Sequence, residues 1–329
     1  SKRQKNSDSD FISFSSLTNH YHDKVKDFIN NPDSKQKHIV QEKLDGSNFS
    51  IRMNHNNEII FCSRNRVLNG QFHNYESLVP DLSNYAENIF NEFGNSVYIF
   101  GELMGCGYMD LPVKRKNSRF QNKVEYTNDL VFISYDIYNS KTKTYINSSI
   151  ALDALKNAGF TVSPVLATYN SLEEALKHDE VFSSKIPELL GMPKHNLKNE
   201  AEGIVIRPME RDYYINKDRG IFKKKNISFQ ETVKRGPKAK KPNKNSFLDE
   251  YITEPRWNNV RSKYGDNVTQ SEMSEAYVED VFKDIRIDYE NSSDSAKIEI
   301  LGFLDQPKRV GNYKKHIQSK ISSFIKTIE

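Results

Sequence analysis

The sequence predicts an α+β fold, in which a domain of antiparallel sheets with flanking helices precedes a small all-α C-terminal domain. Over the first 233 residues, short runs rich in β-branched and aromatic residues mix with helical patterns, without a strict strand–helix–strand alternation. After residue 245, apolar residues recur at three- and four-residue steps, which is helical periodicity. The length of 329 residues also exceeds what one compact domain usually holds.

The first domain is expected to cover residues 11–233, after a disordered tail at 1–10. Its strand candidates are bounded by turn residues and lie at 38–44, 49–53, 58–63, 97–100, 130–135, 204–206 and 221–222. Its helix candidates are 84–93 and 149–157, and Gly159 follows the second as a typical C-cap glycine.

A basic linker is expected at 234–245, before a helical C-terminal domain at 246–329. From Lys234 to Lys244 the chain carries six basic residues and no acidic one, and its Gly and Pro indicate a solvated tether. The same charge suits contact with a polyanion, as does a second basic stretch at 114–123. Apolar periodicity at 274–285 and 313–328 predicts two of the helices.

The composition excludes several classes of protein. Hydrophobic residues make up 36% and charged residues 28%, yet 19 Phe and 17 Tyr supply large side chains for a core. No apolar run is long enough to span a membrane. Two cysteines, Cys62 and Cys106, cannot build a disulfide framework or a four-cysteine zinc site. We therefore expect an intracellular protein without a membrane partner, cytoplasmic first and organellar as the alternative.

Familiar nucleotide and metal motifs are also absent. The chain has no G-x-x-x-x-G-K-[ST], no G-x-G-x-x-G and no H-E-x-x-H. His20 and His22 lack a third ligand nearby in the sequence.

A more specific pattern is Glu42-Lys43-Leu44-Asp45-Gly46, between two strand candidates. Asp-Gly favours a tight turn, so an ordinary hairpin is one interpretation of these few letters. The other is chemical. A lysine at the end of a strand can act as a nucleophile once its amine loses its proton, which nearby positive charge or desolvation favours.

Five further motifs follow in a fixed order, and they favour the chemical interpretation. They are Ser63-Arg64, Phe100-Gly101-Glu102-Leu103, Phe132-Ile133-Ser134-Tyr135-Asp136, Ala201-Glu202-Gly203-Ile204-Val205-Ile206-Arg207-Pro208 and Phe222-Lys223-Lys224-Lys225-Asn226. The last motif would place alternate lysines on one face of an extended segment. In order and spacing, the set closely resembles the covalent nucleotidyltransferase superfamily of DNA ligases, RNA ligases and mRNA capping enzymes. Within it the chain resembles the RNA ligase 2 family of nick-sealing, ATP-dependent RNA ligases.

The resemblance is strong over residues 11–230 and fainter at 256–260, which read RWNNV. It implies a nucleotidyltransferase (ATP-grasp-like ligase) fold, so that residues 11–233 form an adenylyltransferase domain. It also implies a monomeric ligase that joins RNA 3′-OH and 5′-phosphate ends at nicks in duplex RNA or RNA–DNA hybrids, through lysyl-AMP and RNA-adenylate intermediates. The implied cofactors are ATP, with AMP as the covalent adduct, and Mg²⁺ or Mn²⁺.

The resemblance assigns three catalytic lysines. It implies that Lys43 attacks the α-phosphate of ATP, while Lys223 and Lys225 contact that phosphate and neutralise the transition state. Phe132 would stack on one face of adenine, with core packing as its alternative role, and Val205 would lie against the other face. The whole implied ATP-binding set is Glu42, Lys43, Asn48, Arg64, Glu102, Phe132, Glu202, Val205, Lys223 and Lys225.

Within that set, Glu102 would bind the ribose hydroxyls, Arg64 the ribose or the phosphate at the nick, and Asn48 phosphate in the later steps. Glu202 is the first choice for a metal ligand, with Asp45 and Glu102 acting directly or through waters. One departure is informative, because the best-known nick-sealing members carry His where this chain has Asp45. Adenylation of the lysine, the first step, is still expected with Asp45. The difference bears on the later steps, in which AMP passes to the RNA and the ends are joined.

Two other hypotheses about the function stay open at this point. A DNA ligase or capping guanylyltransferase of the same superfamily would normally carry an OB-fold where this chain has helical periodicity. A nucleic-acid-binding protein that keeps the fold without catalysis would usually have lost the nucleophile or the later lysines, and all of them are present.

Overall fold

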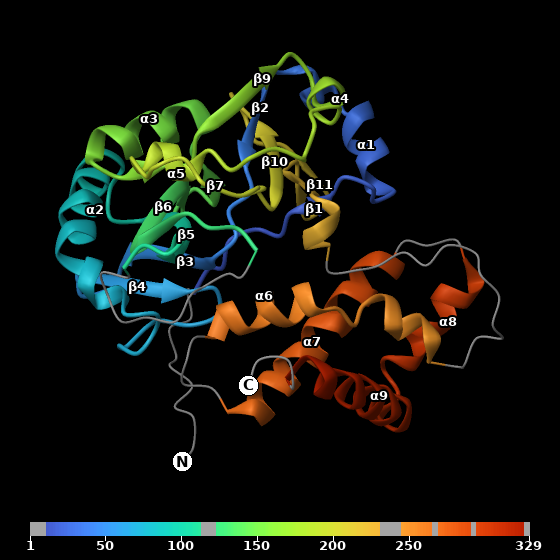
Figure 1. Cartoon of the computed structure of the whole chain (residues 1–329). Helices are drawn as coiled ribbons and strands as arrows, with labels where there is room; N and C mark the ends of the chain where they lie inside the picture. Colours follow the sequence, from blue (N-terminus) through green and yellow to red (C-terminus); the bar gives the residue numbers. More distant parts are fainter. Residues whose placement is uncertain (1–10, 113–122, 231–244, 265–268, 291–293, 326–329) are drawn as a thin grey trace.

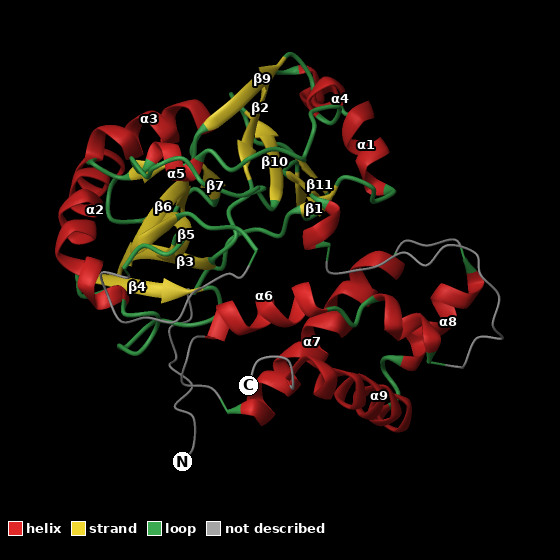
Figure 2. Cartoon of the chain, viewed as in Figure 1, coloured by secondary structure: helices red, strands yellow, loops and turns green. Residues whose placement is uncertain are grey.

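The computed structural model describes residues 11–112, 123–230, 245–264, 269–290 and 294–325. The expected tail at 1–10, the basic stretch at 114–122 and the linker at 234–244 lie outside the described residues. Within them the chain has the α+β architecture that the sequence predicts. Strands and helices mix up to residue 230, and only helices follow residue 245 (Figure 2).

The larger sheet has six strands, in the order β4-β3-β5-β6-β7 with β8 beside β6. Its strands are β3 (Ser47–Met53), β4 (Ile59–Ser63), β5 (Val97–Gly107), β6 (Thr127–Asn139), β7 (Thr144–Tyr145) and β8 (Thr161–Val162). All pairs are antiparallel except β6 with β8. Helices α2 (Val79–Phe93) and α3 (Ser148–Ala158) cover one face and bury the main core there. Gly159 adopts the left-handed conformation at the end of α3, as the predicted C-cap requires.

The second sheet has five strands, in the order β1-β13-β10-β2-β9. These are β1 (Thr18–Asn19), β2 (His38–Glu42), β9 (Val165–Tyr169), β10 (Gly203–Pro208) and β13 (Phe222–Lys225). Helices α1 (Lys24–Asn30) and α4 (Leu172–Ala175) pack beside it around Phe28, Val40 and Phe222. The remaining short elements are α5 (Ile186–Leu189), the pair β11 (Tyr214–Ile215) and β12 (Asp218–Arg219), and 3-10 turns at Pro32–Lys35, Tyr75–Leu78, Ile227–Phe229 and Ser246–Glu250.

The segment that follows β2 crosses from one sheet to the other. β2 pairs with β10 and β9, whereas β3 pairs with β4 and β5. The hairpin interpretation of the Asp-Gly pair is therefore wrong. A Cβ on Gly46 would lie 2.5 Å from the carbonyl oxygen of Leu103, so only glycine lets the crossover pass this close to β5. Lys43 consequently lies where the two sheets meet.

The helical segment consists of α6 (Glu254–Tyr264), α7 (Gln270–Tyr289), α8 (Ser295–Phe303) and α9 (Pro307–Ile325). Thr269 and Glu272 form a capping box that starts α7. A separate core holds the helices together, around Trp257, Tyr277 and Ile317. In the described parts of the chain, no helix is both long and apolar enough to cross a membrane.

The helical segment docks on the crossover that carries Lys43 (Figure 1). The carbonyl oxygen of Ser262 in α6 accepts hydrogen bonds from the hydroxyl of Ser47 and from Nε2 of His73, the latter at 2.9 Å. The Ser262 hydroxyl donates to the carbonyl oxygen of Gly46 at 3.2 Å. These contacts bring α6 and α7 to the edge of the two-sheet junction.

Candidate active site

A cavity of about 340 Å³ lies at the junction of the two sheets and the helices α6 and α7. Eight of the predicted site residues line it: Glu42, Lys43, Asn48, Arg64, Glu102, Val205, Lys223 and Lys225. They come from β2 and the crossover, from β3, from the turn after β4, and from β5, β10 and β13. The fold thus gathers into one place motifs that are scattered along the sequence.

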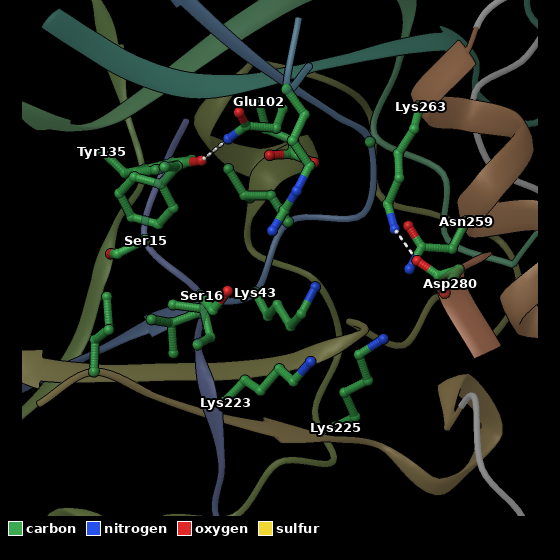
Figure 3. A pocket seen from close by; sticks show the side chains of 18 of the residues that line it. Ser15, Ser16, Lys43, Glu102, Tyr135, Lys223, Lys225, Asn259, Lys263 and Asp280 are labelled. Carbon is green, nitrogen blue, oxygen red and sulfur yellow. Dashed lines mark hydrogen bonds and ion pairs between the residues drawn. The ribbon is translucent and has the colours of Figure 1, made fainter. Parts of the chain in front are cut away.

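Three lysine side chains end in the same space within this cavity (Figure 3). Lys43 enters it from the crossover, while Lys223 and Lys225 enter from one face of β13. The lysine between them, Lys224, points away and pairs with Glu180 at 2.7 Å. Because side chains alternate along a strand, Lys223 and Lys225 enter the cavity, whereas Lys224 forms an ion pair outside it. The pattern of alternate lysines predicts this separation.

Glu202 lies between two of these lysines. Its carboxylate accepts from Lys43 Nζ at 2.6 Å and pairs with Lys225 Nζ at 3.0 Å. Burial alone would raise the pKa of Glu202, but these two ammonium groups lower it below its ordinary value. The next residue, Gly203, has φ +148°, and a Cβ there would lie 2.1 Å from the carbonyl oxygen of Lys224. The Glu-Gly pair is thus needed to bring the carboxylate close to β13.

Glu102 is the second acid at the cavity. Burial, helped by the negative charges of Glu202 and Asp45, raises its pKa to about 8 against the opposing charges of Lys43 and Arg64. At neutral pH the Glu102 carboxyl therefore holds its proton, so it can donate as well as accept a hydrogen bond. Such a group suits a ligand hydroxyl.

Glu42 is held by the chain around it. Its carboxylate accepts from the hydroxyl of Ser184 at 2.6 Å and from the backbone N–H of Lys185 at 2.7 Å. Burial raises its pKa to about 7 despite these hydrogen bonds. Glu42 lines the cavity, but its carboxylate anchors the segment before α5.

Phe132 is not part of the cavity, so the prediction that it stacks on adenine does not hold in this structure. Its ring is 5% exposed and packs in the main core, against Phe49 and Phe160 at centroid distances of 5.5 and 5.9 Å. Tyr135 of the same motif lines the cavity instead. Tyr135 follows Phe132 by three positions along β6, and an odd step places two side chains on opposite faces of a sheet.

Tyr135 and Asn48 form one wall of the cavity. The Tyr135 hydroxyl accepts a hydrogen bond from Asn48 Nδ2 at 2.7 Å. Burial raises the pKa of Tyr135 well above its usual value, so its hydroxyl stays protonated. The wall is therefore neutral, aromatic and able to hydrogen-bond.

The three predicted metal residues do not form a closed metal site. Within the described ranges, no group of three or more His, Cys, Asp or Glu is arranged to hold an ion. Asp45 does not line the cavity, and its N–H donates to the hydroxyl of Tyr126 at 3.0 Å. Asp45 and Glu202 nevertheless lie close enough to Glu102 to raise its pKa. A hydrated Mg²⁺ that shares its ligands with a bound phosphate needs only one or two such carboxylates, so the residues fit this kind of site.

The cavity also has a wall that the sequence interpretation did not include. Helices α6 and α7 contribute Asn259, Lys263, Tyr264, Glu279, Asp280, Lys283 and Asp284 to the lining. Figure 3 shows Asn259, Lys263 and Asp280 across the cavity from Tyr135. The faint family segment at 256–260 contained Asn259, and no local pattern distinguishes Lys263 or Lys283 from other helical lysines.

This arrangement can bind an anion and carry out nucleophilic chemistry. Lysines from two elements surround the place where an electrophilic phosphorus would meet Lys43, and a protonated acid and a tyrosine stand beside them. The combination suits a nucleotide, which has phosphates at one end and sugar hydroxyls and an aromatic base at the other.

Comparisons with known proteins show what this chain is similar to. A family model described as RNA ligase matches residues 36–225, a range that includes every predicted site residue. Protein Early 65 kDa of Autographa californica nuclear polyhedrosis virus is 31% identical over 153 residues, which are 45% of this chain and 26% of that protein. The chain thus matches about a quarter of the length of this relative.

Solved structures of the Naegleria gruberi RNA ligase are similar at lower identity. A mutant with ATP and Mn is 20% identical with a TM-score of 0.43, over 66% of this chain and 56% of that chain. A mutant with AMP and Mn is 18% identical with a TM-score of 0.44, over 66% and 57%. Both structures are therefore distant neighbours of this chain. The family model, in contrast, covers more than half of the chain, and the protein therefore belongs to the RNA ligase family.

Proposed function

We propose that this protein is an ATP-dependent RNA ligase that joins a 3′-OH to a 5′-phosphate at nicks in duplex RNA or RNA–DNA hybrids. The observation that carries the proposal is the position of Lys43. Its amine lies in a cavity with Lys223 and Lys225, against the carboxylate of Glu202, in a chain of the RNA ligase family.

In the first step, the Lys43 amine attacks the α-phosphorus of ATP. A P–N bond forms, the bond from that phosphorus to the bridging oxygen breaks, and pyrophosphate leaves. The Lys43 ammonium first gives up its proton to water, and Glu202, whose carboxylate oxygen lies 2.6 Å from the nitrogen, holds the amine in place for the attack. Lys223 and Lys225 stabilise the charge that develops on the phosphate oxygens.

The nucleoside would occupy the side of the cavity that Tyr135 and Glu102 form. The protonated Glu102 carboxyl binds a ribose hydroxyl, while Val205 and Tyr135 offer apolar and aromatic surface to the base. Mg²⁺ or Mn²⁺ would be held by Glu202 or Asp45, directly or through waters, with the protonated Glu102 taking part only through a water, and would supply charge stabilisation at the phosphates when bound.

In the later steps, the AMP moves from Lys43 to the 5′-phosphate of the RNA, and the P–N bond is exchanged for a phosphoanhydride. The 3′-OH then attacks that RNA phosphate, loses its proton, and releases AMP. Arg64 and Asn48 line the same cavity and are suited to contact phosphate in these steps.

The test combines labelling with sealing. The wild-type protein, stripped of any pre-bound AMP, is incubated with Mg²⁺ and α-labelled ATP or GTP, and then with nicked duplexes of RNA, RNA–DNA hybrid or DNA. We expect ATP alone to give a protein label that survives a denaturing gel, and RNA nicks to be sealed. Labelling by GTP would indicate a capping-type enzyme. Sealing of DNA nicks alone would indicate a DNA ligase, and the absence of any label would refute nucleotidyl transfer.

Tyr135 and Phe132 offer a matched test of which aromatic residue serves the nucleotide. Tyr135→Ala removes a cavity wall and the partner of Asn48, so we expect the KM for ATP in the labelling reaction to rise roughly tenfold or more. Phe132→Ala should instead lower the free energy of unfolding by about 3–5 kcal/mol, as truncation of a core aromatic does. Denaturant unfolding measured beside labelling separates the two effects. A Phe132→Ala protein that is as stable as the wild type but has lost ATP affinity would instead indicate that Phe132 contacts the nucleotide.

A further inference from the structure

Three cationic side chains from separate elements line the cavity apart from the lysines already assigned to the α-phosphate. Arg64 follows β4, Lys263 lies near the end of α6, and Lys283 lies on α7. The helical segment therefore contributes two cations to a cavity whose nucleophile belongs to the sheets. Neither Lys263 nor Lys283 has a role in the steps proposed above.

The three cations lie near enough to repel one another. Desolvation lowers the pKa of Lys283, and the positive charges of Arg64 and Lys263 lower it further, while Asp280 and Asp284 oppose the shift. Among the described residues, neither Arg64 nor Lys283 forms an ion pair with a carboxylate. Like charges gathered at a cavity favour an anionic ligand that neutralises them.

The neighbouring acids are already engaged by other cations. Asp280 pairs with Arg256 at 2.6 Å and with Lys263 at 3.2 Å, and Arg256 also holds Asp284 at 2.7 Å. Arg256 is fully buried, so these two carboxylates serve first to compensate its charge. Glu279 also lines the cavity and reduces the excess of positive charge without removing it.

The position of Lys263, on the side of the cavity that α6 and α7 form, fits the end of a nucleotide that lies beyond the α-phosphate. In Figure 3 the amines of Lys43, Lys223 and Lys225 lie between Tyr135 on one side and Lys263 with Asp280 on the other. A nucleoside on the Tyr135 side, with its α-phosphate at these amines, would direct its remaining phosphates toward α6 and α7.

We propose that Arg64, Lys263 and Lys283 form a second phosphate subsite, so that the helical segment completes the binding site that the sheets begin. The inference rests on the proposed function and deepens it. The ligand chemistry is a phosphate group beyond the α-phosphate. The β- and γ-phosphates of ATP supply it in the first step, and the 5′-phosphate of an RNA strand has the same chemistry.

Inorganic pyrophosphate is the direct probe, because its binding requires no catalysis. Calorimetry compares the full-length wild type, the Lys263→Gln/Lys283→Gln double variant, and a Lys314→Gln/Lys315→Gln control that removes the same charge from exposed positions of α9 outside the cavity. We expect the double variant to bind at least roughly tenfold more weakly and the control to match the wild type. Lys283→Gln alone should show part of the loss, and Lys283→Arg should restore it.

Equal binding by wild type and double variant, or no binding by wild type, would overturn the subsite, whatever the protein does with ATP. Two further measurements identify the source of the phosphate. Slower labelling from ATP with unchanged sealing of a pre-adenylated RNA strand points to the β- and γ-phosphates. Unchanged labelling with slower sealing points to the RNA phosphate. A wild type that binds pyrophosphate but never takes a label from ATP would refute the proposed function and leave the subsite standing.

Discussion

Replacing Lys43 with alanine is expected to abolish covalent labelling from ATP. The label requires a P–N bond to this side chain. Among the described residues, one other amine contacts Glu202 as Lys43 does, and it belongs to Lys225. Lys225 cannot substitute, because it enters from β13 on the other side of Glu202 rather than from the crossover. Gel labelling with α-labelled ATP, run beside the wild type, measures the effect.

Lys43→Arg is the matched control for charge. It keeps a cation that can pair with Glu202, but a guanidinium does not lose its proton in a protein and cannot be the nucleophile. We expect no label from this variant either. Both variants should still seal a pre-adenylated RNA strand, because that step needs the cavity but not the lysine nucleophile. A labelled Lys43→Ala protein would show that another residue carries the AMP.

The sequence predicts that Lys223 and Lys225 share one face of their strand, because this information is local. Alternation along one strand puts Lys223 and Lys225 on the same face, and the Glu-Gly pair at Glu202 fixes a backbone conformation that only glycine adopts readily. The apolar periodicity at 274–285 likewise falls inside α7. Patterns within a few residues of one another were therefore sufficient for these features.

Phe132 shows where local information failed. Its motif holds two aromatic residues on one strand, and the choice between them depends on which face of β6 meets the second sheet. The pairing of β5 with β6 also contains a bulge. Phe100 pairs with Asp136 and Gly101 with Ser134, so Tyr135 is an extra residue on β6. Neither the face nor the bulge is encoded in the spacing of the motif.

The helical wall of the cavity could not be predicted for a different reason. Ser262 meets Gly46 and His73 through hydrogen bonds that join segments about 200 residues apart, and helical periodicity describes only the face that each helix buries in its own core. Lys263 and Lys283 lie off that face. Their position depends on how the helical segment docks, which is tertiary information.

Asp136→Asn is expected to cost about 3–5 kcal/mol of the free energy of unfolding, because it removes the carboxylate shared by two fully buried guanidinium groups. Asp136 Oδ2 lies 3.1 Å from Arg207 and 2.8 Å from Arg219, and it joins β6 of one sheet to β10 and β12. Arg219 would keep its second partner, Asp212, whereas Arg207 would lose its direct ion pair and keep a hydrogen bond to the carbonyl oxygen of Tyr135. The last acid of the motif at 132–136 is therefore structural, since it does not line the cavity.

Asp153→Asn on α3 is the matched control, because it makes the same chemical change at an exposed position. It should leave stability within about 0.5 kcal/mol of the wild type. Denaturant unfolding of the three proteins gives the comparison, and labelling from ATP below the unfolding transition gives a second one. If Asp136 acts only through the fold, the Asp136→Asn protein that remains folded should still take the label. A variant as stable as the wild type that no longer takes the label would instead make Asp136 part of the chemistry, acting through Arg207 at the cavity wall.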